Sequence, residues 1–111
     1  MRNLMPNDII VDVETVLTGV QVDPKGRGRA YLTAYQILEQ LPQQIKDRLI
    51  TERGTPGMGA GKHYAAASVV SDAAEKIPGI EIVFLETSSI KIMLNETDIA
   101  PGNKYVGLYR L

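Results

Sequence analysis

The dipeptide Pro78–Gly79 separates two kinds of hydrophobic pattern in this chain of 111 residues. Before it, over residues 29–77, apolar residues recur at helical spacing. After it, they follow one another in short runs rich in β-branched side chains. Proline cannot continue a helix and glycine favours a turn, so the two patterns belong to different elements. Helices and strands segregated in this way predict an α+β fold, with three helices packed on a small antiparallel sheet.

Residues 29–77 carry the signals of three helices. Thr33 and Gln36 have the spacing of a capping box, which predicts that the first helix begins after Thr33. Pro42 ends this helix and can begin the second as its first residue. The apolar stripe of the first helix consists of Tyr35, Ile37, Leu38 and Leu41, and that of the second of Ile45, Leu49 and Ile50. The third helix is expected from residue 62 to 77, with its stripe on Ala66, Val69, Val70, Ala73 and Ile77.

Strands are expected at both ends of the chain. In residues 8–22, Ile9, Val11 and Val13 alternate and β-branched content is high, which favours a strand region. A basic loop then extends to residue 28. Residues 79–87 predict a strand that turns at Ser88–Ser89 and returns along residues 90–94 as a hairpin, while residues 95–103 predict a longer turn. Residues 104–111 predict a third strand, so the chain forms a single domain over 1–111 in which residues 78–111 supply the antiparallel strands.

The C-terminal strands are apolar on both faces. Ile82 and Phe84 fall on one face of the expected strand, and Val83 and Leu85 on the other. A small sheet with one face in water would alternate more cleanly between apolar and polar residues. Two arrangements explain the pattern: the helices cover one face and the N-terminal segment covers the other, or a second subunit covers it. The second arrangement predicts a homo-oligomer, such as a homodimer.

The order of three helices followed by strands, over residues 29–111, resembles that of winged-helix DNA-binding domains. The resemblance implies that the third helix approaches a nucleic-acid groove, with Lys62, His63 and Ser68 at the contact. In a helix-turn-helix, three or four residues join the last two helices. Here the segment GTPGMGAG puts about eight between them.

The glycine-rich segment before residue 62 is not a Walker nucleotide site. That motif is G-x-x-x-x-G-K-[ST] after a strand. Pro56 stands where the first glycine is needed, and His63 replaces the hydroxyl residue. Glycines before a helix N-terminus still suit an anion, because backbone N–H groups can turn toward it. Gly59, Gly61, Lys62 and His63 are therefore candidates for binding an anion, and the alternative is that the glycines only carry the chain around a corner.

The net charge of -1 is unevenly distributed along the chain. Residues 24–64 carry a net +4, whereas residues 1–23 carry -3 and residues 65–111 carry -2. A basic middle segment favours an anionic partner such as DNA, although charge also fluctuates along any chain. The expected phosphate contacts are Lys25, Arg27, Arg29, Arg48 and Arg53.

Several classes of chemistry are disfavoured by what the sequence lacks. It has no cysteine, which excludes disulfides and cysteine-based zinc sites and suits a reducing compartment. His63 is the only histidine, and no catalytic motif is present, so we expect neither enzyme activity nor a metal or cofactor. The N-terminus lacks a signal-peptide apolar region, and no apolar run is long enough to span a bilayer, so a cytoplasmic location without membrane contact is expected.

Three functions remain as expectations. The first is a small non-enzymatic nucleic-acid-binding or regulatory protein with a winged-helix-like layout. The second is an oligomeric protein–protein interaction module, or an inhibitory accessory protein of the type that phages carry. The third is a binder of a small anionic ligand or nucleotide at the glycine-rich loop.

Overall fold

The computed structural model describes residues 2–53, 62–86, 92–94, 97–99 and 105–111. The elements follow in the order η1 (Pro6–Asp8), α1 (Ile10–Thr18), β1 (Leu32–Thr33), α2 (Ala34–Gln40), α3 (Gln43–Arg53), α4 (Lys62–Glu75), β2 (Glu81–Glu86), β3 (Ile92–Leu94), β4 (Thr97–Ile99) and β5 (Tyr105–Arg110).

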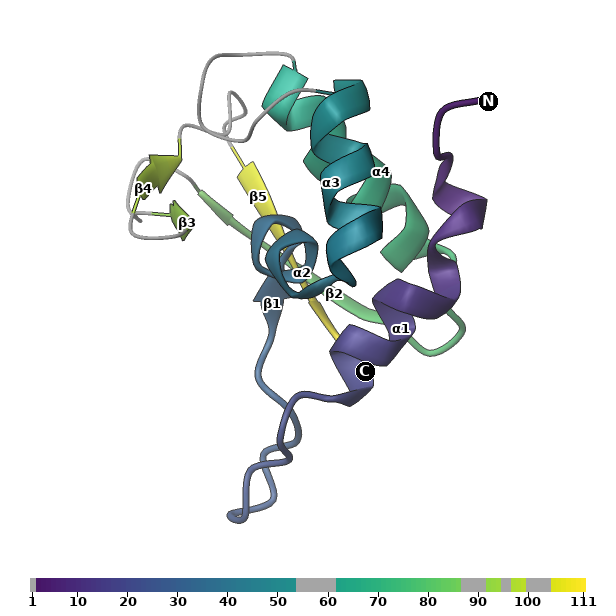
Figure 1. Ribbon diagram of the computed structural model, residues 1–111. Helices are drawn as coiled ribbons and strands as arrows, with labels where there is room; N and C mark the ends of the chain where they lie inside the picture. The colour runs from purple at the N-terminus through teal and green to yellow at the C-terminus, as the bar shows by residue number, and fades with distance from the viewer. Residues whose placement is uncertain (1, 54–61, 87–91, 95–96, 100–104) are drawn as a thin grey trace.

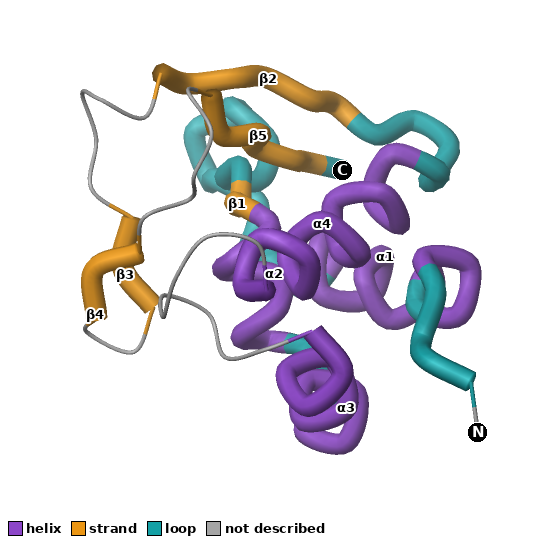
Figure 2. The backbone as a smooth tube through the Cα atoms, turned by 90° about the horizontal axis from the view of Figure 1, so that it is seen from above, coloured by secondary structure: helices purple, strands orange, loops and turns teal. Residues whose placement is uncertain are grey.

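The described elements form two layers. One is an antiparallel sheet with the strand order β1-β5-β2, and the other consists of α1 to α4 (Figure 1). Seen from above, the four helices lie on the same side of this sheet (Figure 2). A separate ladder joins β3 to β4. The α+β class expected from the sequence is therefore confirmed. No helix in the described part of the chain combines the length and apolar character needed to cross a bilayer.

The prediction of a strand region over residues 8–22 is wrong, because Ile10–Thr18 forms helix α1. Ile9, Val13 and Leu17 recur every four residues and are all fully buried, so they form one helical stripe. This stripe packs α1 against α2 and α4. Burial of that stripe outweighs the modest preference of β-branched residues for strands. The N-terminal segment consequently joins the helical layer and does not cover the outer face of the sheet.

The prediction of a hairpin over residues 79–94 is also wrong, since β2 pairs with β5 and not with β3. Their ladder covers six residue pairs and sets Ile82 opposite Tyr109 and Phe84 opposite Gly107. β3 pairs instead with β4, which lies inside the segment expected to be a turn. The pairing of β2 with β5 buries Tyr109 and packs Ile82 against the core. Local turn signals in the sequence give no information about this burial of apolar surface. The wing of a winged helix is therefore not formed by β2 and β3.

The start of α2 agrees with the sequence prediction in atomic detail. The Gln36 backbone N–H donates to Thr33 Oγ1 at 3.1 Å, and the Thr33 N–H donates to Gln36 Oε1 at 2.7 Å, which completes the capping box. Pro42 directly precedes α3, and its carbonyl accepts from the N–H groups of Ile45 and Lys46 at 3.0 Å each. The core predicted from these helices is confirmed at Tyr35, Ile37, Leu38, Leu41, Leu49, Ala66, Val69, Val70, Ala73 and Ile77, all of which are buried.

The N-terminal segment is hydrogen-bonded to α3. The Leu4 N–H donates to Glu52 Oε1 at 2.8 Å, and Arg53 Nη2 donates to the Leu4 carbonyl at 3.2 Å. Asp8 closes the segment on itself, because it accepts two bonds of 2.7 Å from the Arg2 guanidinium and one of 2.8 Å from the Met5 N–H. These donors lower the pKa of the Asp8 carboxyl to about 2, the Arg2 hydrogen bond contributing most.

The lowered pKa of Asp8 predicts a pH-dependent stability contribution. A carboxyl whose pKa is lower in the folded state stabilises the fold above its unfolded value and loses that contribution as the pH falls through its folded value. The window therefore runs from the ordinary pKa of 3.8 down to about 2. We expect Asp8→Asn to be less stable than wild type at neutral pH, and the difference to shrink across this window. Urea unfolding of both proteins measures it, and a difference that stays constant down to the lower limit would contradict the assignment.

Candidate functional site

The basic loop after α1 forms an arm, which we define as residues 22–29. It is closed by a bridge between Val22 and Arg29, and Gly26 and Gly28 adopt positive φ values of 83° and 81°. Arg29 donates to the Val20 carbonyl at 3.0 Å and to the Leu111 carbonyl at 3.3 Å, so it anchors the arm to the body. Arg27 pairs with Asp23 within the arm, and Lys25 is exposed.

Arg48 and Arg53 hold the N-terminal segment in place. Arg48 pairs with Glu52 at 3.0 Å and donates to the Arg2 carbonyl at 2.8 Å. The Arg53 bond to the Leu4 carbonyl leaves its Nε atom buried without a hydrogen-bond partner among the described residues. Both guanidinium groups therefore have intramolecular roles.

The five residues expected to contact phosphates lie on two separate elements, the arm and α3. The arm projects from the lower end, whereas α3 ends with Arg53 and α4 begins at the upper end (Figure 1). The structure brings Arg48 and Arg53 together on α3 and keeps Lys25, Arg27 and Arg29 on the arm. Gly59 and Gly61 lie outside the described residues, as do the side chains of Lys62 and His63. Anion binding at the glycine-rich loop stays a prediction.

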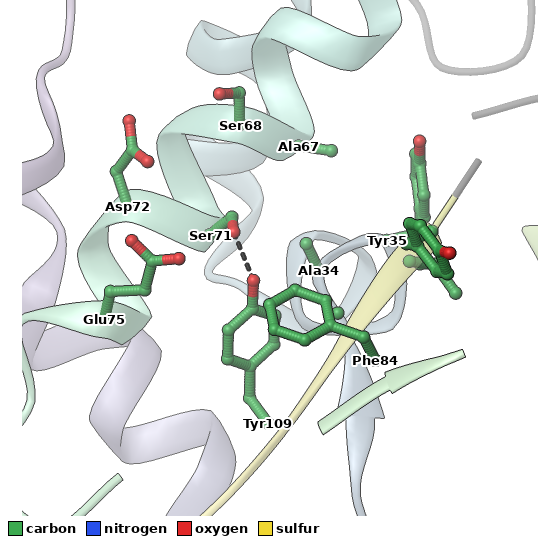
Figure 3. A pocket seen from close by; sticks show the side chains of 12 residues that line it. Ala34, Tyr35, Ala67, Ser68, Ser71, Asp72, Glu75, Phe84 and Tyr109 are labelled. Atoms are coloured by element: carbon green, nitrogen blue, oxygen red, sulfur yellow. Dashed lines mark hydrogen bonds between the residues drawn. The ribbon is translucent and has the colours of Figure 1, made fainter. Parts of the chain in front are cut away.

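Ser68, the remaining residue expected at a site, lines a cavity of about 230 Å³ between α4 and the sheet. We call this cavity the α4–sheet groove (Figure 3). The helix wall of the groove consists of Ala67, Ser68, Ser71, Asp72 and Glu75. The sheet wall includes Phe84, Tyr105, Val106, Gly107 and Tyr109, and α2 contributes Ala34 and Tyr35.

The helix wall follows from the same periodicity that builds the core. Ser68, Ser71, Asp72 and Glu75 are spaced i, i+3, i+4 and i+7, so they lie on one side of α4. The apolar stripe of α4 is buried against α1, α2 and α3, which leaves this polar side for the sheet and solvent.

A tyrosine joins the two walls at the floor of the groove. Tyr109 is 2% exposed, and its hydroxyl is hydrogen-bonded to Ser71 Oγ (Figure 3). Its ring lies across Gly107 of the same strand, where an added Cβ would stand only 2.7 Å from Tyr109 Oη. Glycine at this position therefore permits the close approach that brings Tyr109 to α4.

The groove is acidic. Asp72 and Glu75 are exposed, and neither has an ion-pair partner among the described residues. No lysine or arginine of the described chain lines the groove. Among the described residues, no three histidine, aspartate or glutamate side chains are grouped so that they could hold a metal ion. The aromatic residues Phe84 and Tyr105 line the same groove as these carboxylates, and aromatic rings, like carboxylates, attract cations.

The strand that carries Phe84 is also the edge of its sheet. β2 pairs on one side with β5, and no other described strand pairs with it. Val83, Phe84 and Leu85 are 40%, 64% and 41% exposed, and neighbouring Tyr105 of β5 is 54% exposed. We call the side of β2 that points away from β5, together with the exposed side chains of Val83, Phe84 and Leu85, the β2 edge. The β2 edge therefore combines exposed apolar side chains with backbone N–H and C=O groups that can form hydrogen bonds with another strand.

The end of β2 near the chain terminus is fixed by an ion pair. Arg110 Nε donates to Glu81 Oε2 at 2.7 Å, and the Arg110 guanidinium lies 4.4 Å from the centre of the Tyr31 ring. The hydrogen bond from Arg110 lowers the pKa of the Glu81 carboxyl. These contacts hold Glu81, the first residue of β2, against β5.

Sequence reasoning found Ser68 but not the rest of the groove. The spacing of the four polar residues marks one side of α4, yet nothing local connects it to Phe84 or Tyr105. That connection requires the β2–β5 pairing and the position of the sheet, both of which are long-range.

Comparison with known proteins assigns no family. No protein-family model matches the chain, and no curated protein or solved structure is significantly similar to it.

Proposed function

We propose that this chain is a non-catalytic interaction module that binds a partner protein by strand addition at the β2 edge. The observation that carries this proposal is the exposure of Val83, Phe84 and Leu85 on a strand with one unpaired side among the described residues. The absence of enzyme activity and the cytoplasmic location expected from the sequence stay predictions.

The composition of β2 supports strand addition. Proteins usually protect an exposed edge with lysine, proline or a bulge. β2 has the sequence EIVFLE, with four apolar residues in its centre, glutamates only at its ends, and a continuous register with β5. In strand addition, main-chain hydrogen bonds supply affinity and adjoining pockets supply selectivity. The α4–sheet groove, which Phe84 lines, is such a pocket.

Charges on the outer face of β2 test this proposal. We expect the double variant Val83→Lys/Leu85→Lys to lose at least about tenfold of its partner affinity, because lysines on an edge oppose the approach of another strand. Its matched control is Val11→Lys/Val22→Lys, which changes two exposed valines, 74% and 51% accessible, on α1 and the arm. Capture of partners from an extract of the source cells measures the effect. Equal capture by both variants would contradict the proposal.

Nucleic-acid binding through the arm is a second candidate. One observation favours it: the arm projects from the body and exposes Lys25 and Arg27 (Figure 1). The ion pair between Arg27 and Asp23 within the arm reduces the positive charge that the arm can offer to phosphates.

Salt dependence separates this candidate from strand addition. Phosphate contacts make affinity fall steeply as salt rises. A mobility-shift titration at two salt concentrations, with wild type and Lys25→Ala/Arg27→Ala, measures it. Salt-sensitive binding that the double variant weakens supports the arm, and no binding at low salt ends this candidate.

A further inference from the structure

We infer that the strand bound at the β2 edge is basic, and that one of its lysine or arginine side chains enters the α4–sheet groove. The inference rests on the proposed strand addition and names the chemistry of the partner. It is carried by the juxtaposition of the acidic helix wall, Asp72 and Glu75, with the aromatic residue Phe84 on the edge strand.

Strand geometry brings such a side chain to the groove. Successive side chains of a strand point to opposite faces of the sheet. Phe84 shares its face with Tyr109, because it follows Ile82, the residue opposite Tyr109, by two positions. Tyr109 faces α4, as its bond to Ser71 shows. In an added strand, the residue opposite Phe84 would have its Cβ about 5 Å from that of Phe84 and on the same face. Its side chain would therefore point toward α4.

The groove suits a long cationic side chain in size and in charge. Its volume of about 230 Å³ is many times the roughly 10–15 Å³ that a cavity needs to hold one water molecule. Asp72 and Glu75 can accept hydrogen bonds from an ammonium or guanidinium group. Phe84, which lines the same groove, offers an aromatic ring to a cation there. The methylene stem can lie against Ala67 and the ring of Tyr109, which also line the groove.

The same charges disfavour other occupants. A second copy of this chain would add its own β2, whose sequence EIVFLE contains no lysine or arginine. It would therefore bring no cationic side chain to Asp72 and Glu75. Nucleic acid would bring phosphates to a groove that the described cations do not line. A basic extended segment of another protein is the occupant that these charges favour.

Two matched peptides test the inference. Both are terminally blocked, fluorescently labelled and eight residues long, alternate threonine and valine, and differ at one central position, which is arginine in one and glutamate in the other. We expect the arginine peptide to bind wild type at least about tenfold more tightly by fluorescence anisotropy. Asp72→Asn/Glu75→Gln should remove this preference and keep the binding of both peptides. The control Val11→Lys/Val22→Lys should retain the preference.

The possible failures are distinguishable. Equal binding of the two peptides to wild type, with loss of both in Val83→Lys/Leu85→Lys, overturns the inference and leaves strand addition standing. Binding of neither peptide overturns strand addition and the inference with it. A wild-type dimer on a sizing column that Val83→Lys/Leu85→Lys converts to monomer shows that a second copy occupies the edge, which also overturns the inference. Circular dichroism of each variant establishes that the fold is retained.

Discussion

Replacing Leu38 with alanine is expected to lower the free energy of unfolding by about 2–5 kcal/mol. Leu38 belongs to α2, is 0% exposed, and lies in a core cluster that also contains residues of α1, α3 and α4. Shortening it removes apolar contacts and leaves a cavity that helices on several sides cannot readily fill. A chain of 111 residues has little stability to spare, so this is the largest effect we expect from a single truncation.

Urea unfolding measures this loss, and Leu85→Ala is the matched control. Leu85 is also a leucine, but it is 41% exposed on the β2 edge, so its truncation should cost much less. Losses of the same size at the two positions would show that Leu38 does not occupy the centre of the core.

The second large effect is expected at Gly107, where alanine should destabilise the fold by about 1–3 kcal/mol. Its Cβ would stand 2.7 Å from Tyr109 Oη and 3.1 Å from Tyr109 Cζ. Tyr109 is buried and bonded to Ser71, so its ring cannot move aside without loss of that bond. We therefore expect Gly107→Ala to separate the sheet from α4 and to deform the α4–sheet groove.

A double-mutant cycle isolates this contact. Tyr109→Phe removes the hydroxyl oxygen that an added Cβ would meet first. The cost of Gly107→Ala should then be smaller in the Tyr109→Phe background than in wild type, as measured by urea unfolding. Equal costs in both backgrounds would show that the Tyr109 hydroxyl does not limit residue 107.

The parts of the fold that local signals control could be predicted from the sequence. The capping box at Thr33 and Gln36 predicted the start of α2, and the stripe from Ala66 to Ala73 identified the buried side of α4. Helix caps and helical periodicity act within a few residues, so one sequence suffices to recognise them.

The errors arose where two periodicities compete or where partners are distant. Ile9, Val11 and Val13 alternate like a strand, but Ile9, Val13 and Leu17 also fit a helix, and packing on α4 decides for the helix. β2 lies closer in sequence to β3 than to β5, yet it pairs with β5 across 18 intervening residues, 87–104. Local patterns indicate that a strand exists, whereas tertiary packing selects its partner.

Charge in the sequence was a poor guide to the candidate site. Arg29, Arg48 and Arg53 looked available for a ligand, but each is hydrogen-bonded to a backbone carbonyl elsewhere in the chain. Asp72 and Glu75 gave only the signal of a polar helix side. They line the α4–sheet groove together with Phe84 and Tyr109, whose positions depend on the long-range pairing of β2 with β5.

Amide hydrogen exchange of β2, with and without the arginine peptide, tests strand addition most directly. The account predicts that peptide binding slows exchange at the β2 amides that point away from β5, because they become hydrogen-bonded to the added strand, while exchange in the arm of residues 22–29 stays unchanged. Slower exchange confined to the arm or to α4, with the β2 amides unaffected, would contradict it.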